Sequence, residues 1–279
     1  MEHQTRTFSG YSGLSLQADT FGDEAGLPVI LAHGGGQTRH AWRGAGEALA
    51  GAGYYSICLD LRGHGASAWC PEGDYRIEDF AQDLLSVCET FDTRPVLVGA
   101  SLGGIAAMVA AGEIDPLVFR SVVFVDVTPH MEMNGVDKIL GFMREHLDEG
   151  FGSLQEAADA ISGYLPQRPK PRDLSGLEKN LREIDGRYFW HWDPKFVTGV
   201  NRPSASRDPE RLAKAVGNIN APILLVRGRM SELVSQECVD KFLELVPHAE
   251  FVDVVDAGHM VAGDRNDVFN EAVVGFLSG

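Results

Sequence analysis

A serine between glycines has the spacing of a catalytic nucleophile. Residues 99–103 read Gly-Ala-Ser-Leu-Gly, and they join an apolar run at 95–98 to a helical pattern at 102–111. When G-x-S-x-G stands between a strand and a helix, the serine occupies a tight, strained turn that exposes its hydroxyl. The backbone N–H of Leu102, at the start of the helix, can then stabilise an oxyanion at the same place. The pattern predicts that Ser101 is the nucleophile of an acyl transfer.

A glycine-rich loop earlier in the chain could supply a second oxyanion donor. His33 is followed by three glycines at 34–36, directly after an apolar run at 28–32. Esterases and lipases place an oxyanion-binding N–H in such a loop, and Gly35 is the expected donor. A P-loop is excluded because no Lys-Ser/Thr pair follows. The alternative is a strand-to-helix turn without a catalytic role.

One of the nine histidines has the placement of a general base. His259 follows the last predicted strand, so it comes after both the serine and the acidic candidates, as in the order Ser–acid–His. His64 lies in the turn 60–67, where we expect a structural role. In the same turn, Asp60 and Arg62 are expected to be turn and salt-bridge residues.

Two carboxylates compete for the third position of a triad. Asp126 ends the apolar run 121–125, and Glu232 lies in the loop after the run 221–226. A carboxylate at a strand end can reach Nδ1 of His259 and fix the tautomer of the ring. We take Asp126 as the first choice and keep Glu232 as the alternative; a helix cap or a surface charge would be the structural explanation of either.

Four aromatic residues are candidates for the wall of a substrate pocket. His40 and Trp42 follow the glycine loop, and Trp190 and Trp192 belong to an aromatic cluster further along the chain. For the two later tryptophans, packing between helices and core is the alternative.

Short apolar runs alternate with helical patterns over most of the chain. The predicted strands are 28–32, 54–59, 95–98, 121–125, 221–226 and 249–254, and the predicted helices are 40–51, 77–91, 102–111 and 267–277. Near-continuous apolar strands separated by helices indicate a parallel sheet that is covered on both faces. Residues 5–21 alternate around Ser-Gly turns, which predicts an antiparallel hairpin at the sheet edge.

The alternation stops between residues 128 and 218. Three helical segments are predicted there: 136–149, 154–164 and 177–184. A Pro-rich connection lies at 166–171. We therefore predict a core of residues 1–127 and 219–279 with a helical lid at 128–218. The lid would leave the carboxyl end of a strand, where open α/β sheets bind ligands. The alternative is a packed helical subdomain without a functional part.

Over essentially its whole length, the chain resembles the α/β-hydrolase superfamily. The loop at His33, the turn 60–67, the elbow at Ser101 and the loop at His259 occur in the order and spacing of that family. The resemblance implies a mostly parallel sheet of about eight strands, a lid inserted after the sixth strand and a Ser–acid–His triad. It is closest to the esterase and epoxide-hydrolase-like branches. Epoxide hydrolases and haloalkane dehalogenases carry Asp at the elbow, so the serine resembles the esterase, lipase and carbon–carbon hydrolase branches.

The resemblance bears on the acid as well. Many relatives place it after the seventh strand, at the third residue beyond a glycine; here Ser231 holds that position and Glu232 follows. Other branches place the acid at the end of the sixth strand, where this chain has Asp126.

Composition excludes several other classes of protein. The chain has 24 basic and 40 acidic residues and a net charge of −16, which argues against nucleic acid and against a polybasic membrane patch. No basic segment followed by an apolar run begins the sequence, so we expect a cytoplasmic protein. The four cysteines lack the spacing of a metal site and are expected to be reduced: Cys58, Cys70, Cys88 and Cys238.

These features predict a serine hydrolase that cleaves a small, fairly apolar carboxylic ester or lactone through an acyl-enzyme. The expected partner is a small-molecule substrate, with no metal and no organic cofactor; assembly into a homo-oligomer is left open. The alternatives are hydrolysis of a carbon–carbon bond in a β-diketone and a cofactor-free oxygenase or perhydrolase that uses the His–Asp pair. A catalytically silent ligand receptor on the same fold is a further alternative.

Overall fold

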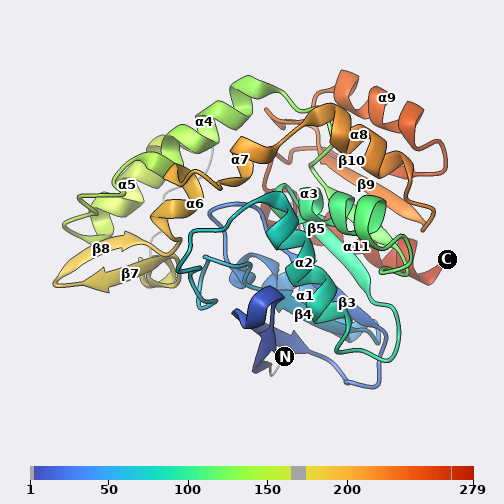
Figure 1. The fold of residues 1–279 in the computed structure, drawn as a ribbon, viewed down its shortest axis with the longest axis horizontal. Coiled ribbons are helices and arrows are strands. Elements are labelled where there is room, and N and C mark those ends of the chain that lie inside the picture. Colours follow the sequence, from blue (N-terminus) through green and yellow to red (C-terminus); the bar gives the residue numbers. More distant parts are fainter. Residues whose placement is uncertain (1–2, 165–173, 265) are drawn as a thin grey trace.

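The centre of the molecule is an eight-stranded sheet with the strand order β1-β2-β4-β3-β5-β6-β9-β10 (Figure 1). The computed structural model describes residues 3–164, 174–264 and 266–279. The hairpin of β1 and β2 is antiparallel and forms one edge, β2 pairs antiparallel with β4, and the other pairings are parallel. The predicted α/β fold and edge hairpin are thus confirmed. The strands are β1 Gln4–Ser9, β2 Ser15–Phe21, β3 Pro28–Ala32, β4 Tyr55–Leu59, β5 Val96–Ala100, β6 Val122–Val125, β9 Ile223–Gly228 and β10 Glu250–Val254.

Helices cover both faces of the sheet because the central strands are apolar on both sides. In β3, Ile30 and Ala32 belong to one core cluster, and Val29 and Leu31 belong to the other. The first cluster includes side chains of α2 (Ile77–Cys88), α3 (Leu102–Val109), α8 (Pro209–Gly217) and α9 (Gln236–Leu245). The second includes side chains of α1 (Arg43–Gly51) and α11 (Asn266–Ser278), two helices that pack against each other.

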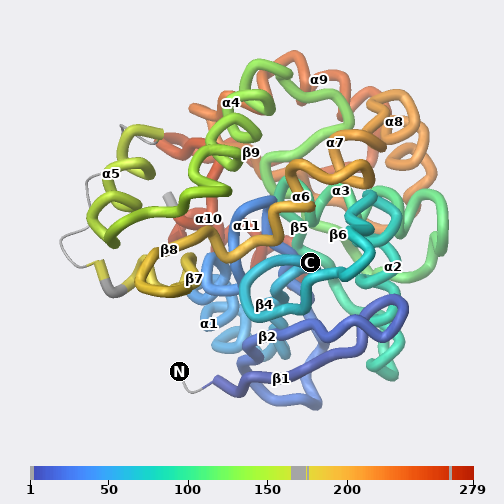
Figure 2. Tube along the Cα trace, turned by 60° about the vertical axis from the view of Figure 1, so that its left-hand side comes forward, coloured from blue at the N-terminus to red at the C-terminus, as the bar shows by residue number. Residues whose placement is uncertain are grey.

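A long segment joins β6 to β9 and carries a second, small sheet. Its elements before α8 are α4 Met133–Arg144, α5 Leu154–Tyr164, β7 Leu181–Ile184, β8 Arg187–Trp190, α6 Pro194–Thr198 and α7 Pro203–Ser206. Figures 1 and 2 show α4, α5 and the β7–β8 hairpin together on one side of the molecule, apart from β1 and β2. The Pro-rich stretch 166–171 lies outside the described residues.

The predicted helix over 177–184 is wrong. The chain forms a short 3-10 helix at Ser175–Asn180 and then enters β7, which pairs antiparallel with β8. Asp185 and Gly186 connect the two strands with φ of 51° and 76°. Two positive φ values in a two-residue connection are those of a type I′ turn, for which Asp-Gly is a favoured sequence. The Asp-Gly dipeptide therefore favours a hairpin over a helix in this segment.

The last helix of the connecting segment belongs to the core layer. α8 packs against α3 and against the π-helical turn Ala110–Ile114 that follows α3.

Within the described residues, no helix is both long enough and apolar enough to cross a lipid bilayer. All four cysteines are free and buried.

Candidate active site

Ser101 lies on a sharp elbow between β5 and α3. Its φ of 44° and ψ of −110° are strained for a residue with a side chain. The surrounding glycines make the turn sterically possible. A Cβ on Gly99 would lie 2.7 Å from the backbone nitrogen of Gly104, and a Cβ on Gly103 would lie 2.4 Å from the carbonyl oxygen of Ala32. The elbow therefore forms because this sequence removes the side chains that would block it.

Asp126 and His259 form a hydrogen-bonded pair. Asp126 directly follows β6, is fully buried and has a φ of 49°. Its Oδ2 lies 2.7 Å from Nδ1 of His259 and accepts a hydrogen bond of 2.5 Å from the Ser231 hydroxyl. Its Oδ1 accepts the N–H of Gly228 at 3.2 Å. The carboxylate is thus held in place from β9 and the following loop, and no described residue forms a hydrogen bond with Nε2 of His259.

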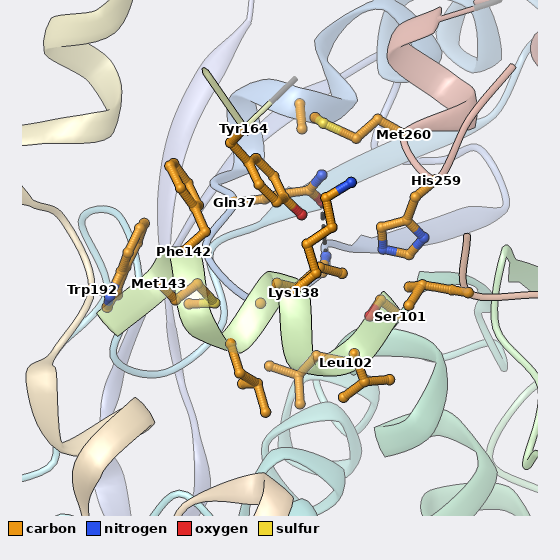
Figure 3. A pocket seen from close by; sticks show the side chains of 18 of the residues that line it. Gln37, Ser101, Leu102, Lys138, Phe142, Met143, Tyr164, Trp192, His259 and Met260 are labelled. Atoms are coloured by element: carbon orange, nitrogen blue, oxygen red, sulfur yellow. Dashed lines mark hydrogen bonds between the residues drawn. The ribbon is translucent and has the colours of Figure 1, made fainter. Parts of the chain in front are cut away.

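Glu232, the alternative acid, points elsewhere. Its side chain is 65% exposed, and its carboxylate pairs with Nζ of Lys138 at 2.7 Å. The structure therefore brings Asp126, and not Glu232, to His259. In Figure 3, Ser101 and His259 lie on the same side of a pocket, with Lys138 of α4 reaching in beside them.

In the loop after β3, the backbone N–H of Gly35 has no acceptor among the described residues. The N–H of Gly34 donates to Oε1 of Gln37 at 3.0 Å, and the N–H of Gly36 donates to Nε2 of His64 at 3.1 Å. Among the described residues, no acceptor binds the N–H of Gly35 or that of Leu102. A Cβ on Gly34 would lie 3.2 Å from Cβ of Ser101, so the loop passes directly beside the serine.

Two buried histidines fix the conformation of that loop. His33 accepts the N–H of Leu61 at its Nε2, so its Nδ1–H donates to the carbonyl of Gly34 at 2.8 Å. His64 accepts the N–H of Gly36 at its Nε2, which assigns its own proton to Nδ1. Burial lowers the pKa of both rings to about 3, so both are neutral at pH 7.

A third buried histidine comes from the segment between β6 and β9. His191, directly after β8, accepts the N–H of Gly65 at Nδ1 (2.8 Å), and its Nε2–H donates to the carbonyl of Gly36 at 3.2 Å. Burial lowers its pKa to about 3. The glycine loop is thus held from both sides, by the core through His64 and by the connecting segment through His191.

A cavity of about 690 Å³ opens in front of Ser101. Ser101, Gly35 and His259 line it, and most of its other walls are apolar. The apolar lining includes five residues of α4: Val136, Ile139, Leu140, Phe142 and Met143. This size and lining are those of a site for a small organic molecule.

The four predicted pocket residues divide into two groups. His40, Trp190 and Trp192 line the cavity, and the two indole rings stack at a centroid distance of 4.8 Å. Trp42 does not: it is buried in the core beneath the sheet, where it contacts Phe269 at a ring distance of 5.8 Å. The prediction for Trp42 is corrected because its side chain turns away from the loop toward α11.

The turn 60–67 has the structural role that its sequence predicts. Asp60 accepts the N–H of Arg39 at 2.6 Å and that of Ala66 at 2.9 Å. Arg62 forms a bidentate ion pair with Asp83: its Nε donates to Oδ2 at 2.6 Å and its Nη2 donates to Oδ1 at 2.8 Å. The turn is thereby fixed against β2, α2 and the glycine loop.

Five polar residues of the site were not found from the sequence. Ser231 was noted only as a serine at a position where relatives carry an acid, yet its hydroxyl binds Asp126. The other four have no motif of their own and reach the site only through the tertiary fold: Gln37, Lys138, His191 and Arg207.

The fold and this arrangement of residues define an α/β hydrolase. A family model described as the alpha/beta hydrolase fold matches residues 28–265, and the chain belongs to that family. Esterase Rv0045c of Mycobacterium tuberculosis is 31% identical over 258 residues, which cover 89% of this chain and 82% of the relative. The 3-hydroxybutyrate-oligomer hydrolase of Cupriavidus necator is 26% identical over 86% of this chain and 85% of its own length. With such relatives, the chain is a hydrolase.

Solved structures agree over the whole chain. The crystal structure of E-2-(acetamidomethylene)succinate hydrolase has a TM-score of 0.85 at 24% identity, with both chains fully covered, and this likeness supports the fold. The crystal structure of esterase Rv0045c has a TM-score of 0.76 at 26% identity and covers 100% of this chain and 92% of that one.

Proposed function

We propose that this protein is a serine hydrolase that cleaves a carboxylic ester through an acyl-enzyme intermediate. The observation that carries the proposal is the convergence on one cavity of a strained serine, a histidine paired with a buried carboxylate, and two unused backbone N–H groups. Each matches one requirement of acyl transfer: a nucleophile, an oriented base and an oxyanion hole.

The proposed reaction has two halves. In the first, Oγ of Ser101 attacks the ester carbonyl while Nε2 of His259 takes its proton and passes it to the leaving alcohol. Asp126 keeps the Nδ1 proton of His259 in place and stabilises the imidazolium. In the second half, His259 activates a water molecule that releases the acid from Ser101.

The developing oxyanion would lie between the N–H groups of Gly35 and Leu102. Of the three glycine amides in the loop, those of Gly34 and Gly36 already have acceptors within the protein, which supports Gly35 as the donor. Losing one such donor typically costs about 3–4 kcal/mol of transition-state stabilisation.

The cavity and the relatives support a small, largely apolar ester or lactone as substrate. Most of the wall opposite Ser101 is apolar, and two relatives are named for hydrolysis of esters or of hydroxybutyrate oligomers. Such a cavity holds the acyl chain out of water and leaves the carbonyl at the elbow.

A fluorophosphonate probe with mass mapping tests the nucleophile. We expect the folded protein to be labelled at Ser101, and Ser101→Ala to lose both labelling and ester hydrolysis by at least about a thousandfold. A panel of esters, lactones and β-diketones then defines the reaction. An unlabelled Ser101 in the folded protein, or oxygen uptake that persists in Ser101→Ala, would refute the serine mechanism.

A further inference from the structure

The cavity wall carries positive charge in a protein whose net charge is −16. Its basic lining residues include Lys138, Lys179 and Arg207, and its acidic lining residue among those described is Glu232. Lys138 and Glu232 neutralise each other through their ion pair at 2.7 Å. Among the described residues, the remaining positive charge at the cavity has no acidic counterpart in the wall.

Arg207, which follows α7, is a cation of this wall that has no ion-pair partner among the described residues. Its Nη2 lies 3.4 Å from the carbonyl oxygen of Pro129, and its Nη1 lies 3.6 Å from Sδ of Met133. Its Nε is buried, and no described residue forms a hydrogen bond with it. No carboxylate of the described residues forms an ion pair with its guanidinium.

Two other arginines with little exposed side chain do have carboxylate partners. Nη1 of Arg39 lies 2.5 Å from Asp60, and Nε of Arg62 lies 2.6 Å from Asp83. At these two positions the fold supplies a carboxylate, whereas none of the described residues supplies one to Arg207.

An unpaired guanidinium at the wall of a cavity costs free energy. Burial lowers the pKa of Arg207, because no neighbouring anion offsets the loss of water around its charge. Burying a charge is unfavourable until it is paired and hydrogen-bonded. The planar guanidinium fork matches a carboxylate with two parallel hydrogen bonds, so a ligand carboxylate would complete the site.

We propose that Arg207 binds a carboxylate of the substrate, so that the preferred substrates are esters whose acyl chain ends in a free carboxylate. This inference rests on the proposed ester hydrolysis at Ser101. A carboxylate is favoured over a phosphate because a single guanidinium carries one positive charge and most of the cavity wall is apolar. The strongly acidic surface also repels a dianion more than a monoanion.

Matched ester pairs test the proposal. Monoethyl esters of dicarboxylic acids from glutarate to pimelate are compared with ethyl esters of monocarboxylic acids of equal chain length, by ethanol release. We expect kcat/KM to be at least about tenfold higher for the best acid ester, since a charge-assisted hydrogen bond is worth that much. In Arg207→Met, the ratio of kcat/KM between the acid ester and the neutral ester should fall to about one.

Two further variants separate binding from folding. Arg207→Lys keeps the charge without the fork and should keep part of the preference. Arg202→Met is the matched control, because Arg202 lies in the same segment with a buried, unpartnered Nε but does not line the cavity. It should leave the preference intact. Arg207→Met should not lower the unfolding temperature, since it removes an unpaired charge. Equal loss of activity toward both ester classes would overturn the proposal.

Calorimetry of adipate binding to Ser101→Ala distinguishes this proposal from the hydrolase proposal. Hydrolysis of neutral esters without a preference for acid esters would refute the carboxylate site and leave the hydrolase intact. The opposite outcome is a protein that cleaves no ester but binds adipate, with an affinity that falls at least about tenfold when Arg207→Met is added to Ser101→Ala. That outcome would support the carboxylate site and refute ester hydrolysis. Failure of both measurements would refute both proposals.

Discussion

At the scale of single residues, the three-dimensional surroundings of a carboxylate decide whether it can orient His259. Asp126 and Glu232 both follow strands that end at the same edge of the sheet, yet their surroundings differ. The carboxylate of Asp126 contacts Gly228, Ser231 and His259, and it is fully buried. The carboxylate of Glu232 contacts Lys138 at the surface. A histidine can be oriented only by the first.

We therefore expect Asp126→Asn and Glu232→Gln to have very different effects on hydrolysis. An amide at 126 no longer accepts the Nδ1 proton of His259 as a carboxylate does, so kcat should fall by about a thousandfold or more. Glu232→Gln removes one exposed ion pair, and kcat should stay within about threefold. Steady-state kinetics on the best ester of the panel, with unfolding temperatures as a check on folding, provide the measurement. Mild and equal effects would mean that neither residue orients the base.

The residues that sequence analysis could locate are those whose role is local. Ser101 and Leu102 lie within one turn, so five consecutive residues suffice to predict their geometry. The acid remained open because its choice depends on the register between β6 and β9, which brings Gly228 and Ser231 to Asp126. An unpaired arginine such as Arg207 has no sequence signal at all, because pairing is decided by the tertiary fold.

At the scale of elements, the strand-to-helix elbow depends on close backbone approach. Gly103, at the start of α3, packs against the end of β3, where a Cβ would lie 2.4 Å from the carbonyl oxygen of Ala32. Backbone at both sides of this contact leaves no flexible side chain to move aside. The elbow and the glycine loop after β3 are therefore held at a fixed separation.

Gly103→Ala should destabilise the protein by about 1–3 kcal/mol or more, because α3 must move away from β3. Gly141 of α4 is the matched control: it is exposed, and a Cβ there would meet no atom within 4 Å. Gly141→Ala should stabilise the protein by about 0.5–1 kcal/mol through its lower conformational entropy when unfolded. Urea unfolding measures both. Similar changes in the two variants would contradict the proposed contact.

The elements that sequence analysis identified are those with an unambiguous hydrophobic pattern. Central strands such as β3 and β6 are apolar on both faces, which only burial between two helix layers explains. In the β7–β8 hairpin, the buried residues Leu181 and Trp190 pair with each other at the end away from the turn, and the other residues are exposed or half-buried. With four residues a strand and no regular alternation, its pattern resembles that of a short helix, and only the Asp-Gly turn distinguishes the two.

At the scale of the whole molecule, three buried imidazoles connect parts that are distant in sequence. His33 directly follows β3, His64 lies in the turn 60–67, and His191 belongs to the segment between β6 and β9. The ring centroids of His33 and His64 are 5.2 Å apart, and those of His64 and His191 are 5.8 Å apart. All three bind backbone groups in their neutral form, so the loop that carries Gly35 depends on their remaining uncharged.

This cluster predicts how the stability of the protein depends on pH. Each ring has a pKa near 6.5 when unfolded and of about 3 in the folded protein, so the unfolded chain binds more protons between these values. The stabilisation is present above pH 6.5 and is lost as the pH falls toward 3. Between pH 7 and pH 5, each histidine should lower the free energy of unfolding by about 2 kcal/mol.

Urea unfolding at several pH values between 7 and 5 measures this loss of stability. This range lies above the ordinary pKa of carboxyl groups, so histidines dominate the pH dependence there. His191→Gln keeps a side chain that can hydrogen-bond but removes one titrating group, so its curve should fall less steeply than that of the wild type. His248→Gln is the matched control, because His248 is exposed, and its curve should keep the wild-type slope. Since the cluster holds the glycine loop, ester hydrolysis should fail over the same range in which stability falls. A stability that does not change from pH 7 to pH 5 would show that these histidines are not held neutral.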